Sequence, residues 1–222
     1  MKFYFSAAPN PMKIALFLEE AGIEYEPIPV DTRAGDQHKP DFVAINPNGK
    51  VPVLVDGDAT VFDSSAILLH LGESTGKFIP AASAKNRAEL LSWMMFVGTG
   101  VGPFSGQAVH FQHMVQEDMP YAKKRYVFEA KRHYGILNDH LSSRTYMVGD
   151  TYTIVDMNVW GWARVIPFVL GAEAWTDYPH LKRLVDEIEA RPAAQTAIAL
   201  KDKFTWKAEV DDEARRHMFR HL

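Results

Sequence analysis

The segment Asn46–Leu54 reads NPNGKVPVL, and Phe62–Ile67, which begins ten residues after Pro52, reads FDSSAI. The first segment leads into an apolar, β-branched run that is typical of a strand. The second segment ends another short strand and begins a helix, since aspartate and serine are favoured at helix starts. The Asp-Gly-Asp turn between the two strands predicts a tight hairpin, so this part of the chain is expected to run strand, strand, helix.

Upstream of this segment the sequence predicts alternating strands and helices. An aromatic run is followed by an apolar helical repeat that Gly22 closes, and then by a second strand and a polar loop. The expected strands are residues 2–6, 25–30, 51–55 and 60–62, and the expected helices are residues 11–21 and 64–73, with a helical turn in the loop 31–40. This order predicts a parallel pair of strands with an antiparallel hairpin added at the edge, which is a thioredoxin-like α/β domain.

Beyond Pro80 the strand signals disappear. The expected helices are residues 85–96, 121–141, 153–169, 178–190 and 193–200. The glycine-rich stretch 98–106 is expected to bend or break the fourth helix, and residues 74–84 have the composition of a linker. The sequence therefore predicts an α/β domain over residues 1–78 and an all-α domain over residues 85–222.

Composition excludes several kinds of chemistry. Of 222 residues, 47% are hydrophobic and 23% are charged, which is typical of globular proteins, and the net charge of −4 indicates neither a nucleic acid nor a membrane partner. There is no cysteine, so disulfides and a cysteine nucleophile are excluded, and any thiol chemistry must use the sulfur of a ligand. We expect a cytoplasmic protein, because the sequence has neither a membrane-length apolar run nor a signal pattern.

Together these motifs resemble the glutathione transferase superfamily, and the resemblance implies the glutathione-transferase fold. It implies that the Val51–Pro52 bond is cis and that the N–H and C=O of Val51 bind the cysteinyl backbone of glutathione. It also implies that Asp63 accepts the γ-glutamyl ammonium, while Ser64 binds the γ-glutamyl carboxylate. Read without the resemblance, Pro52 is an ordinary proline at a strand start, and Asp63 and Ser64 form an ordinary helix N-cap.

The start of the first helix, Ser6–Ile14, reads SAAPNPMKI and is most similar to the nu class of bacterial glutathione transferases and to related fungal nitrogen-regulator proteins. By that resemblance, Asn10 holds the glutathione thiolate. Gln37 and Lys50 correspond to positions that contact the glycyl carboxylate or nearby backbone, and Arg125 corresponds to one that reaches the carboxylates from the helical domain. The alternatives are an N-cap role for Asn10 and solvated surface for the other three.

Two departures from the pattern concern the activating turn. Ala8 replaces a threonine, and Pro11 replaces a glycine and so removes one N–H donor. Elsewhere, Thr153–Asp156 has the spacing of a capping box, which is a structural role. His110 and His113 lack a third ligand at suitable spacing, so no metal site is expected.

The resemblance implies an enzyme that uses the thiolate of bound glutathione to reduce a disulfide or a peroxide, or to conjugate a small apolar electrophile. Because the chain has no cysteine, thiol–disulfide exchange would run between glutathione sulfurs, with one or two glutathiones bound. The alternative is a regulatory module that binds glutathione with little turnover. The resemblance also implies a homodimer with two-fold symmetry.

Overall fold

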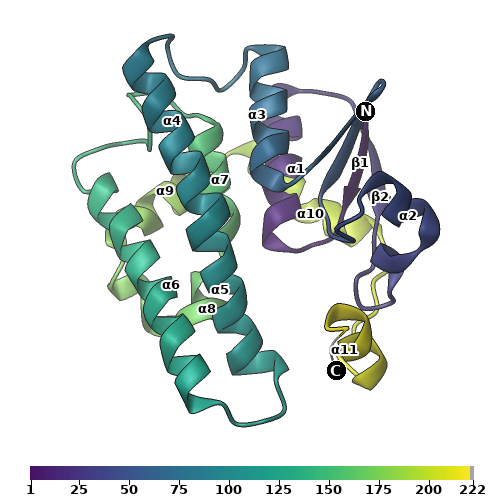
Figure 1. The fold of residues 1–222 in the computed structure, drawn as a ribbon. Helices are drawn as coiled ribbons and strands as arrows, with labels where there is room; N and C mark the ends of the chain where they lie inside the picture. The colour runs from purple at the N-terminus through teal and green to yellow at the C-terminus, as the bar shows by residue number, and fades with distance from the viewer. Residues whose placement is uncertain (221–222) are drawn as a thin grey trace. The chain divides into compact units, whose positions relative to one another are not determined.

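The computed structural model describes residues 1–220, which divide into two compact units (Figure 1). The first unit contains residues 1–70 together with the chain from Pro192 onward, and the second contains Leu71–Arg191. This division differs from the expected boundary at residues 78–85, because it places residues 192–220 with the N-terminal part of the chain. The cause is packing, since the helix that begins at Pro192 lies against the first helix of the chain.

The first unit is built on one four-stranded sheet. Its strands are β1 (Lys2–Phe5), β2 (Glu26–Pro29), β3 (Val53–Asp56) and β4 (Ala59–Phe62), in the order β2-β1-β3-β4. β1 pairs in parallel with β2, whereas the β1–β3 and β3–β4 pairs are antiparallel. The expected mixed sheet of a thioredoxin-like domain is therefore confirmed.

Helices accompany this sheet in the first unit. They are α1 (Pro9–Ala21), α2 (Pro40–Ile45), α3 (Ser64–Thr75), α10 (Pro192–Ala199) and α11 (Asp212–Met218), with short 3-10 turns at Asp36–His38 and Leu200–Lys203. α1 lies against β1 and against α10, and α3 continues past the end of the unit at His70. α1 begins at Pro9, two residues before the expected start, because proline is readily accommodated in a first helical turn. It ends at Ala21 and is followed by the C-cap Gly22, whose φ of 63° is left-handed.

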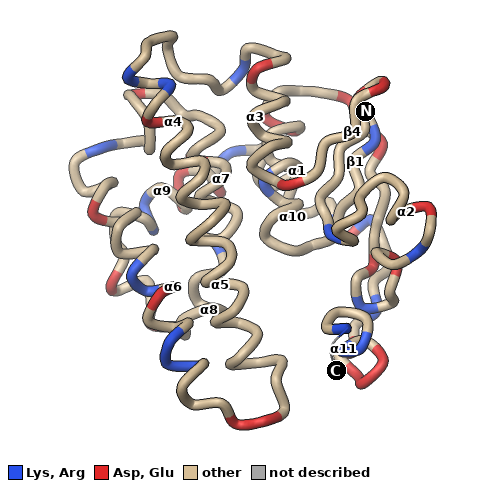
Figure 2. Tube along the Cα trace, viewed as in Figure 1, with Lys and Arg blue, Asp and Glu red and all other residues tan. Residues whose placement is uncertain are grey.

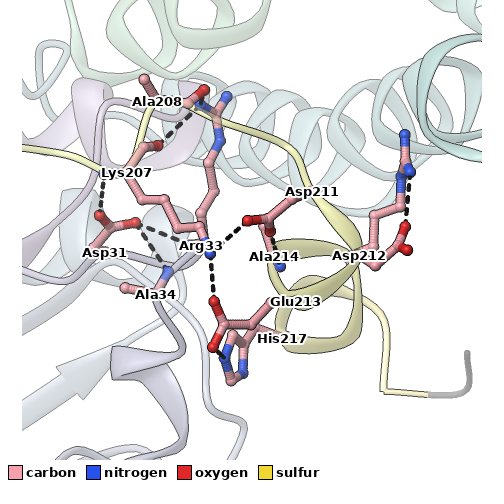
Figure 3. A network of polar contacts seen from close by, with 11 residues as sticks. Asp31, Arg33, Ala34, Lys207, Ala208, Asp211, Asp212, Glu213, Ala214 and His217 are labelled. Atoms are coloured by element: carbon pink, nitrogen blue, oxygen red, sulfur yellow. Dashed lines mark hydrogen bonds and ion pairs between the residues drawn. The ribbon is translucent and has the colours of Figure 1, made fainter.

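The C-terminal segment is attached to the first unit by aromatic and polar contacts. The rings of Phe204 and Trp206 contact the buried ring of Phe5, with centroids 5.4 and 5.6 Å away. The Arg33 guanidinium donates to the carbonyl of Ala208 at 2.6 Å, and the Lys207 N–H donates to Asp31 (Figure 3). α11 carries acidic residues in its first turn and basic residues in its last (Figure 2), which favours the helix through its dipole.

The second unit consists of helices. They are α4 (Ala84–Phe96), α5 (Gly102–Val109), α6 (Pro120–Leu141), α7 (Ile154–Ala163), α8 (Ile166–Leu170) and α9 (Pro179–Glu189), with π turns at Val97–Val101 and His110–Met114 and a 3-10 turn at Ala172–Thr176. The glycine-rich stretch was expected to bend or break the fourth helix; the chain is not broken there, and a π turn at Val97–Val101 interrupts the α-helix and carries the chain from α4 into α5 (Figure 1). The expected helix 153–169 is instead two helices, and Pro167 lies in the first turn of the second.

The capping box at the start of α7 is confirmed. Asp156 is fully buried and its carboxylate accepts the N–H of Thr153 and the N–H of Met147, both at 2.8 Å. The Thr153 hydroxyl in turn accepts the N–H of Val155 at 3.3 Å. These bonds satisfy backbone donors that would otherwise be buried unpaired. Among residues 1–220, no helix has the length and apolar character that crossing a membrane requires.

Candidate functional site

A hollow of about 170 Å³ opens on the first unit where the starts of α1 and α3 meet the loop before β3. Its lining residues are Asn10, Asn46, Asn48, Lys50, Val51, Pro52, Phe62, Asp63 and Ser64. The structure thus brings together the predicted thiolate contact on α1 and the predicted backbone and γ-glutamyl contacts. Whether they bind a ligand stays a prediction at this point.

Asn10 is the second residue of α1, and it is not the N-cap. The N-cap is Ala8, which has extended backbone with φ −73° and ψ 158° and has no side chain able to cap. Pro9 and Pro11 carry no amide hydrogen. Of the first three residues of α1, Asn10 alone therefore has a backbone N–H, and its side-chain amide is a further donor at this helix end.

Asn46 stabilises the loop before β3, and residues of this loop line the hollow. It is 1% exposed, its Nδ2 donates to the carbonyl of Lys50 at 2.6 Å, and its Oδ1 accepts the N–H of Asn48 at 3.0 Å. The second contact is an Asx turn, a local motif that favours asparagine at this position. Sequence reasoning did not identify Asn46 as a site residue, although this turn was a signal that could have found it.

The peptide bond between Val51 and Pro52 is cis, as expected. The antiparallel ladder between β1 and β3 ends at the pair Tyr4 and Val53, so Val51 lies two residues beyond its end. The backbone of Val51 therefore lines the hollow from outside the sheet.

Asp63 and Ser64 approach the hollow from the start of α3. The Asp63 Oδ1 accepts the N–H of Ser65 at 2.8 Å and the N–H of Ala66 at 3.1 Å, so Asp63 is the N-cap of this helix. Its φ of 74° is left-handed, which costs energy for a residue other than glycine, and such residues cluster at functional sites. Ser64 is 5% exposed, and its hydroxyl accepts a hydrogen bond from the Lys13 ammonium at 3.3 Å.

Lys13 is a buried lysine in contact with Ser64, one of the residues that line this hollow. The residue is 1% exposed on α1. Burial lowers the pKa of its ammonium to about 7, against the opposing effect of the negative charge on Asp63. Sequence reasoning did not single out Lys13. The available signal was its position between Met12 and Ile14 in a helix whose face is otherwise apolar.

Gln37 and Arg125 do not line the hollow. Gln37 is buried, and its Nε2 donates to the carbonyls of Thr32 at 3.1 Å and His217 at 3.0 Å. Its Oε1 is buried without a hydrogen-bond partner among the residues described. Arg125 belongs to α6 of the second unit, where it forms an ion pair with Glu129 at 2.9 Å.

Within residues 1–220, no group of three or more histidine, aspartate or glutamate side chains is arranged to hold a metal ion. The hollow instead gathers hydrogen-bond donors. Its lining residues include Asn10 with an amide, Ser64 with a hydroxyl and Lys50 with an ammonium, together with Asp63, which has a carboxylate. This arrangement suits a zwitterionic ligand with more than one carboxylate.

The chain is similar to proteins of one family along most of its length. Residues 2–73 match the model of the glutathione S-transferase N-terminal domain, and residues 103–192 match that of the C-terminal domain. The disulfide-bond oxidoreductase YfcG of Escherichia coli is 37% identical over 95% of this chain and 96% of its own length.

Two crystal structures of bacterial glutathione transferases also superpose well on the chain. The protein of Burkholderia graminis, with two glutathione molecules per subunit, has a TM-score of 0.84 and 31% identity over 91% of this chain and 89% of its own. The protein of Pseudomonas putida, with one glutathione disulfide per subunit, has a TM-score of 0.84 and 29% identity over 90% of each chain.

Proposed function

The chain belongs to the glutathione S-transferase family, and from this premise we propose that the hollow beside Asn10, Val51 and Ser64 binds glutathione and that the bound thiolate reduces disulfides or peroxides. The observation that carries the proposal is the convergence of these residues from three separate segments on one hollow. The names of its relatives favour disulfide reduction among the reactions of the family.

The chemistry of the hollow matches the ionic groups of glutathione. Glutathione has two carboxylates, one ammonium and one thiol. Ser64 and Lys50 supply donors for carboxylates, and the Asp63 carboxylate is an acceptor for the ammonium. Asn10 supplies donors at the positive end of α1, where a thiolate is favoured over a thiol. Arg125 and Gln37 stay candidates for further carboxylate contacts.

Disulfide reduction on this chain must take both electrons from glutathione, because the protein has no cysteine. The thiolate of one glutathione attacks the substrate disulfide, which forms a mixed disulfide and releases one substrate thiolate. A second glutathione thiolate then attacks the mixed disulfide, releasing the other substrate thiolate and forming glutathione disulfide. The two released thiolates take up protons, so two glutathiones and one disulfide give glutathione disulfide and two thiols.

Binding and turnover should be measured side by side. Calorimetry with glutathione and with glutathione disulfide tests the hollow. Initial rates with 2-hydroxyethyl disulfide, a hydroperoxide and an aryl halide distinguish disulfide reduction, peroxide reduction and conjugation of a small apolar electrophile. We expect binding of glutathione and the highest kcat/KM with the disulfide. Absence of glutathione binding would contradict the proposal.

A second function, a binding module with little turnover, is favoured by one observation. Pro9 and Pro11 leave the first turn of α1 with few backbone donors for a thiolate. Tight glutathione binding together with background rates on all three substrates would favour this function over the enzyme.

We also propose that the protein is a homodimer, as the family resemblance implies. The mass of the particle in solution tests this. Light scattering on a size-exclusion column should give about twice the chain mass of 25.1 kDa, and a mass of one chain would contradict it.

A further inference from the structure

We propose that the buried ammonium of Lys13 is a positioning group of this site, which holds the Ser64 hydroxyl as a hydrogen-bond donor toward a bound carboxylate. The inference rests on the proposed glutathione site and adds a residue that acts through Ser64.

The contact with Lys13 assigns the Ser64 oxygen the role of acceptor. The Lys13 Nζ lies 3.3 Å from the Ser64 Oγ, and both residues are at least nine-tenths buried. An ammonium has three donor hydrogens and no lone pair, so the Ser64 oxygen must accept in this contact. The hydroxyl hydrogen is then available to point elsewhere, and Ser64 lines the hollow. A neutral lysine amine, in contrast, has a lone pair that can accept the hydroxyl hydrogen and turn it away from the ligand.

The surroundings of Lys13 contribute few other charges. On the elements packed against α1, α10 carries no ionisable residue, and β1 carries Lys2, which is exposed, and Tyr4, whose ring lies on Phe42. On α3, the ring of His70 is paired with Asp56 at 3.2 Å, and the carboxylate of Glu73 is paired with Arg87 at 2.8 Å.

Asp63, beside the start of α3, is the charge that acts on Lys13. α1 itself also carries Glu19, which accepts a hydrogen bond from the Tyr25 hydroxyl at 2.7 Å, and Glu20.

Ligand binding at this site should therefore be coupled to proton uptake. Because the pKa of buried Lys13 is about 7, the free protein at neutral pH holds a mixture of ammonium and amine. A carboxylate bound beside Ser64 favours the ammonium and raises that pKa. The complex therefore binds more protons than the free protein, so affinity is highest below the pKa of free Lys13 and falls as pH rises through it.

S-Methylglutathione is the appropriate probe, because it keeps both carboxylates and the ammonium but has no thiol proton to release. For a group that titrates at about 7 in the free protein and well above 8 in the complex, its Kd should be about tenfold higher at pH 8 than at pH 6. Calorimetry at pH 7 in two buffers of different ionisation enthalpy should report uptake of roughly half a proton. This measurement needs no variant.

Three variants separate the role of Lys13 from a merely structural one. Lys13→Met should weaken binding and abolish its pH dependence, because the neutral side chain neither titrates nor directs the hydroxyl. Lys13→Arg should bind tightly at both pH values, since arginine stays charged. Lys2→Met removes an exposed lysine from β1 and should keep the wild-type slope.

Two results would overturn the inference while the proposed function stands: a wild-type Kd that is equal at pH 6 and pH 8 with no proton uptake, or a Lys13→Met slope equal to that of the wild type. A wild-type protein that binds S-methylglutathione at neither pH would instead remove the glutathione site itself.

Discussion

Asn10 supplies hydrogen-bond donors at the N-terminus of α1, where Pro9 and Pro11 contribute no backbone N–H. We expect Asn10→Ala to lower kcat/KM with 2-hydroxyethyl disulfide by about tenfold to a hundredfold, the usual effect of losing a hydrogen bond to a charged group. The pH at which the rate is half-maximal should also rise, because the thiolate loses stabilisation. Initial rates between pH 6 and pH 9 measure both effects. Unchanged kinetics on every substrate would remove Asn10 from the mechanism.

Ser64 acts on binding rather than on the reacting sulfur. Ser64→Ala should raise the Kd of glutathione by about tenfold or more, since a hydrogen bond to a carboxylate is lost, while kcat at saturation changes less. Ser65→Ala is the matched control, because its hydroxyl is also buried but is not among the lining groups of the hollow. Equal Kd values for the Ser64 variant and the wild type would show that the ligand lies elsewhere.

The residues of the hollow differ in how far the sequence could predict them. Two short motifs, at the starts of a strand and of a helix that the local sequence pattern predicts, contain Val51, Pro52 and Ser64. Lys13 was not predictable in this way, because a lysine in a helix is buried or solvated depending on the face that packs, which no local pattern reveals. The side chain of Gln37 donates to the carbonyl of His217, 180 residues away, and a contact of that kind was equally hidden from the local sequence.

At the scale of elements, the close approach of α6 to the π turn at Val97–Val101 depends on Gly100. A Cβ built on Gly100 would lie 2.5 Å from the His133 Nε2, and that ring is held between Phe96 and Phe104, with centroids 5.1 and 5.0 Å away. We expect Gly100→Ala to lower the free energy of unfolding by about 1–3 kcal/mol, because the ring has little room to move.

Gly135 offers a matched control on α6, since a Cβ there meets no atom within 4 Å. Gly135→Ala should raise the free energy of unfolding by up to about 1 kcal/mol through helix propensity. Urea unfolding of both variants gives the comparison. Equal effects of the two substitutions would show that the approach to His133 is not tight.

The start of α7 depends on one carboxylate. Asp156→Ala leaves the buried N–H groups of Met147 and Thr153 without their acceptor, so we expect a loss of about 3 kcal/mol in the free energy of unfolding. Thr153→Ala removes a single cap bond and should cost about 1 kcal/mol. Thermal unfolding checks both values, and a smaller loss for the Asp156 variant than for the Thr153 variant would contradict this account.

The helix boundaries show why element types were easier to predict than element ends. An apolar repeat continues through residues 153–169, so one helix was expected, but the chain turns after α7, and α8 begins at Ile166 with Pro167 in its first turn. The stretch 98–106 is rich in glycine, which predicts weakness in a helix. Here the same glycines allow a π turn and close packing of His133, and that outcome depends on a partner helix rather than on the local sequence.

For the molecule as a whole, the course of the C-terminal segment was the least predictable feature. Its contacts join residues about 175 positions apart, such as Arg33 with Ala208, and they depend on the shape of a folded surface. The consequence concerns Gln37, because the carbonyl of His217 on this segment accepts a hydrogen bond from its side chain. The segment therefore covers a residue that the resemblance assigned to glutathione.

The hydrogen bonds of Arg33 allow a test of what holds the C-terminal segment on the first unit. Its guanidinium donates to the carbonyls of Lys207 at 3.2 Å and Ala208 at 2.6 Å (Figure 3). An alanine at position 33 has no donor that could replace these two hydrogen bonds. We expect Arg33→Ala to speed amide hydrogen exchange in residues 207–218 by about tenfold, the effect of losing about 1.4 kcal/mol of local stability. Exchange in α3 should be unchanged.

Arg87→Ala is the control for this variant, because Arg87 is an exposed arginine of the second unit that pairs with Glu73 at 2.8 Å. If the segment covers Gln37 as the structure indicates, the Arg33 variant should also speed exchange at residues 36–38, because these lie under the carbonyl of His217. Faster exchange in residues 207–218 with no change at residues 36–38 would mean that the aromatic contacts of Phe204 and Trp206 with Phe5 hold the segment in place without Arg33.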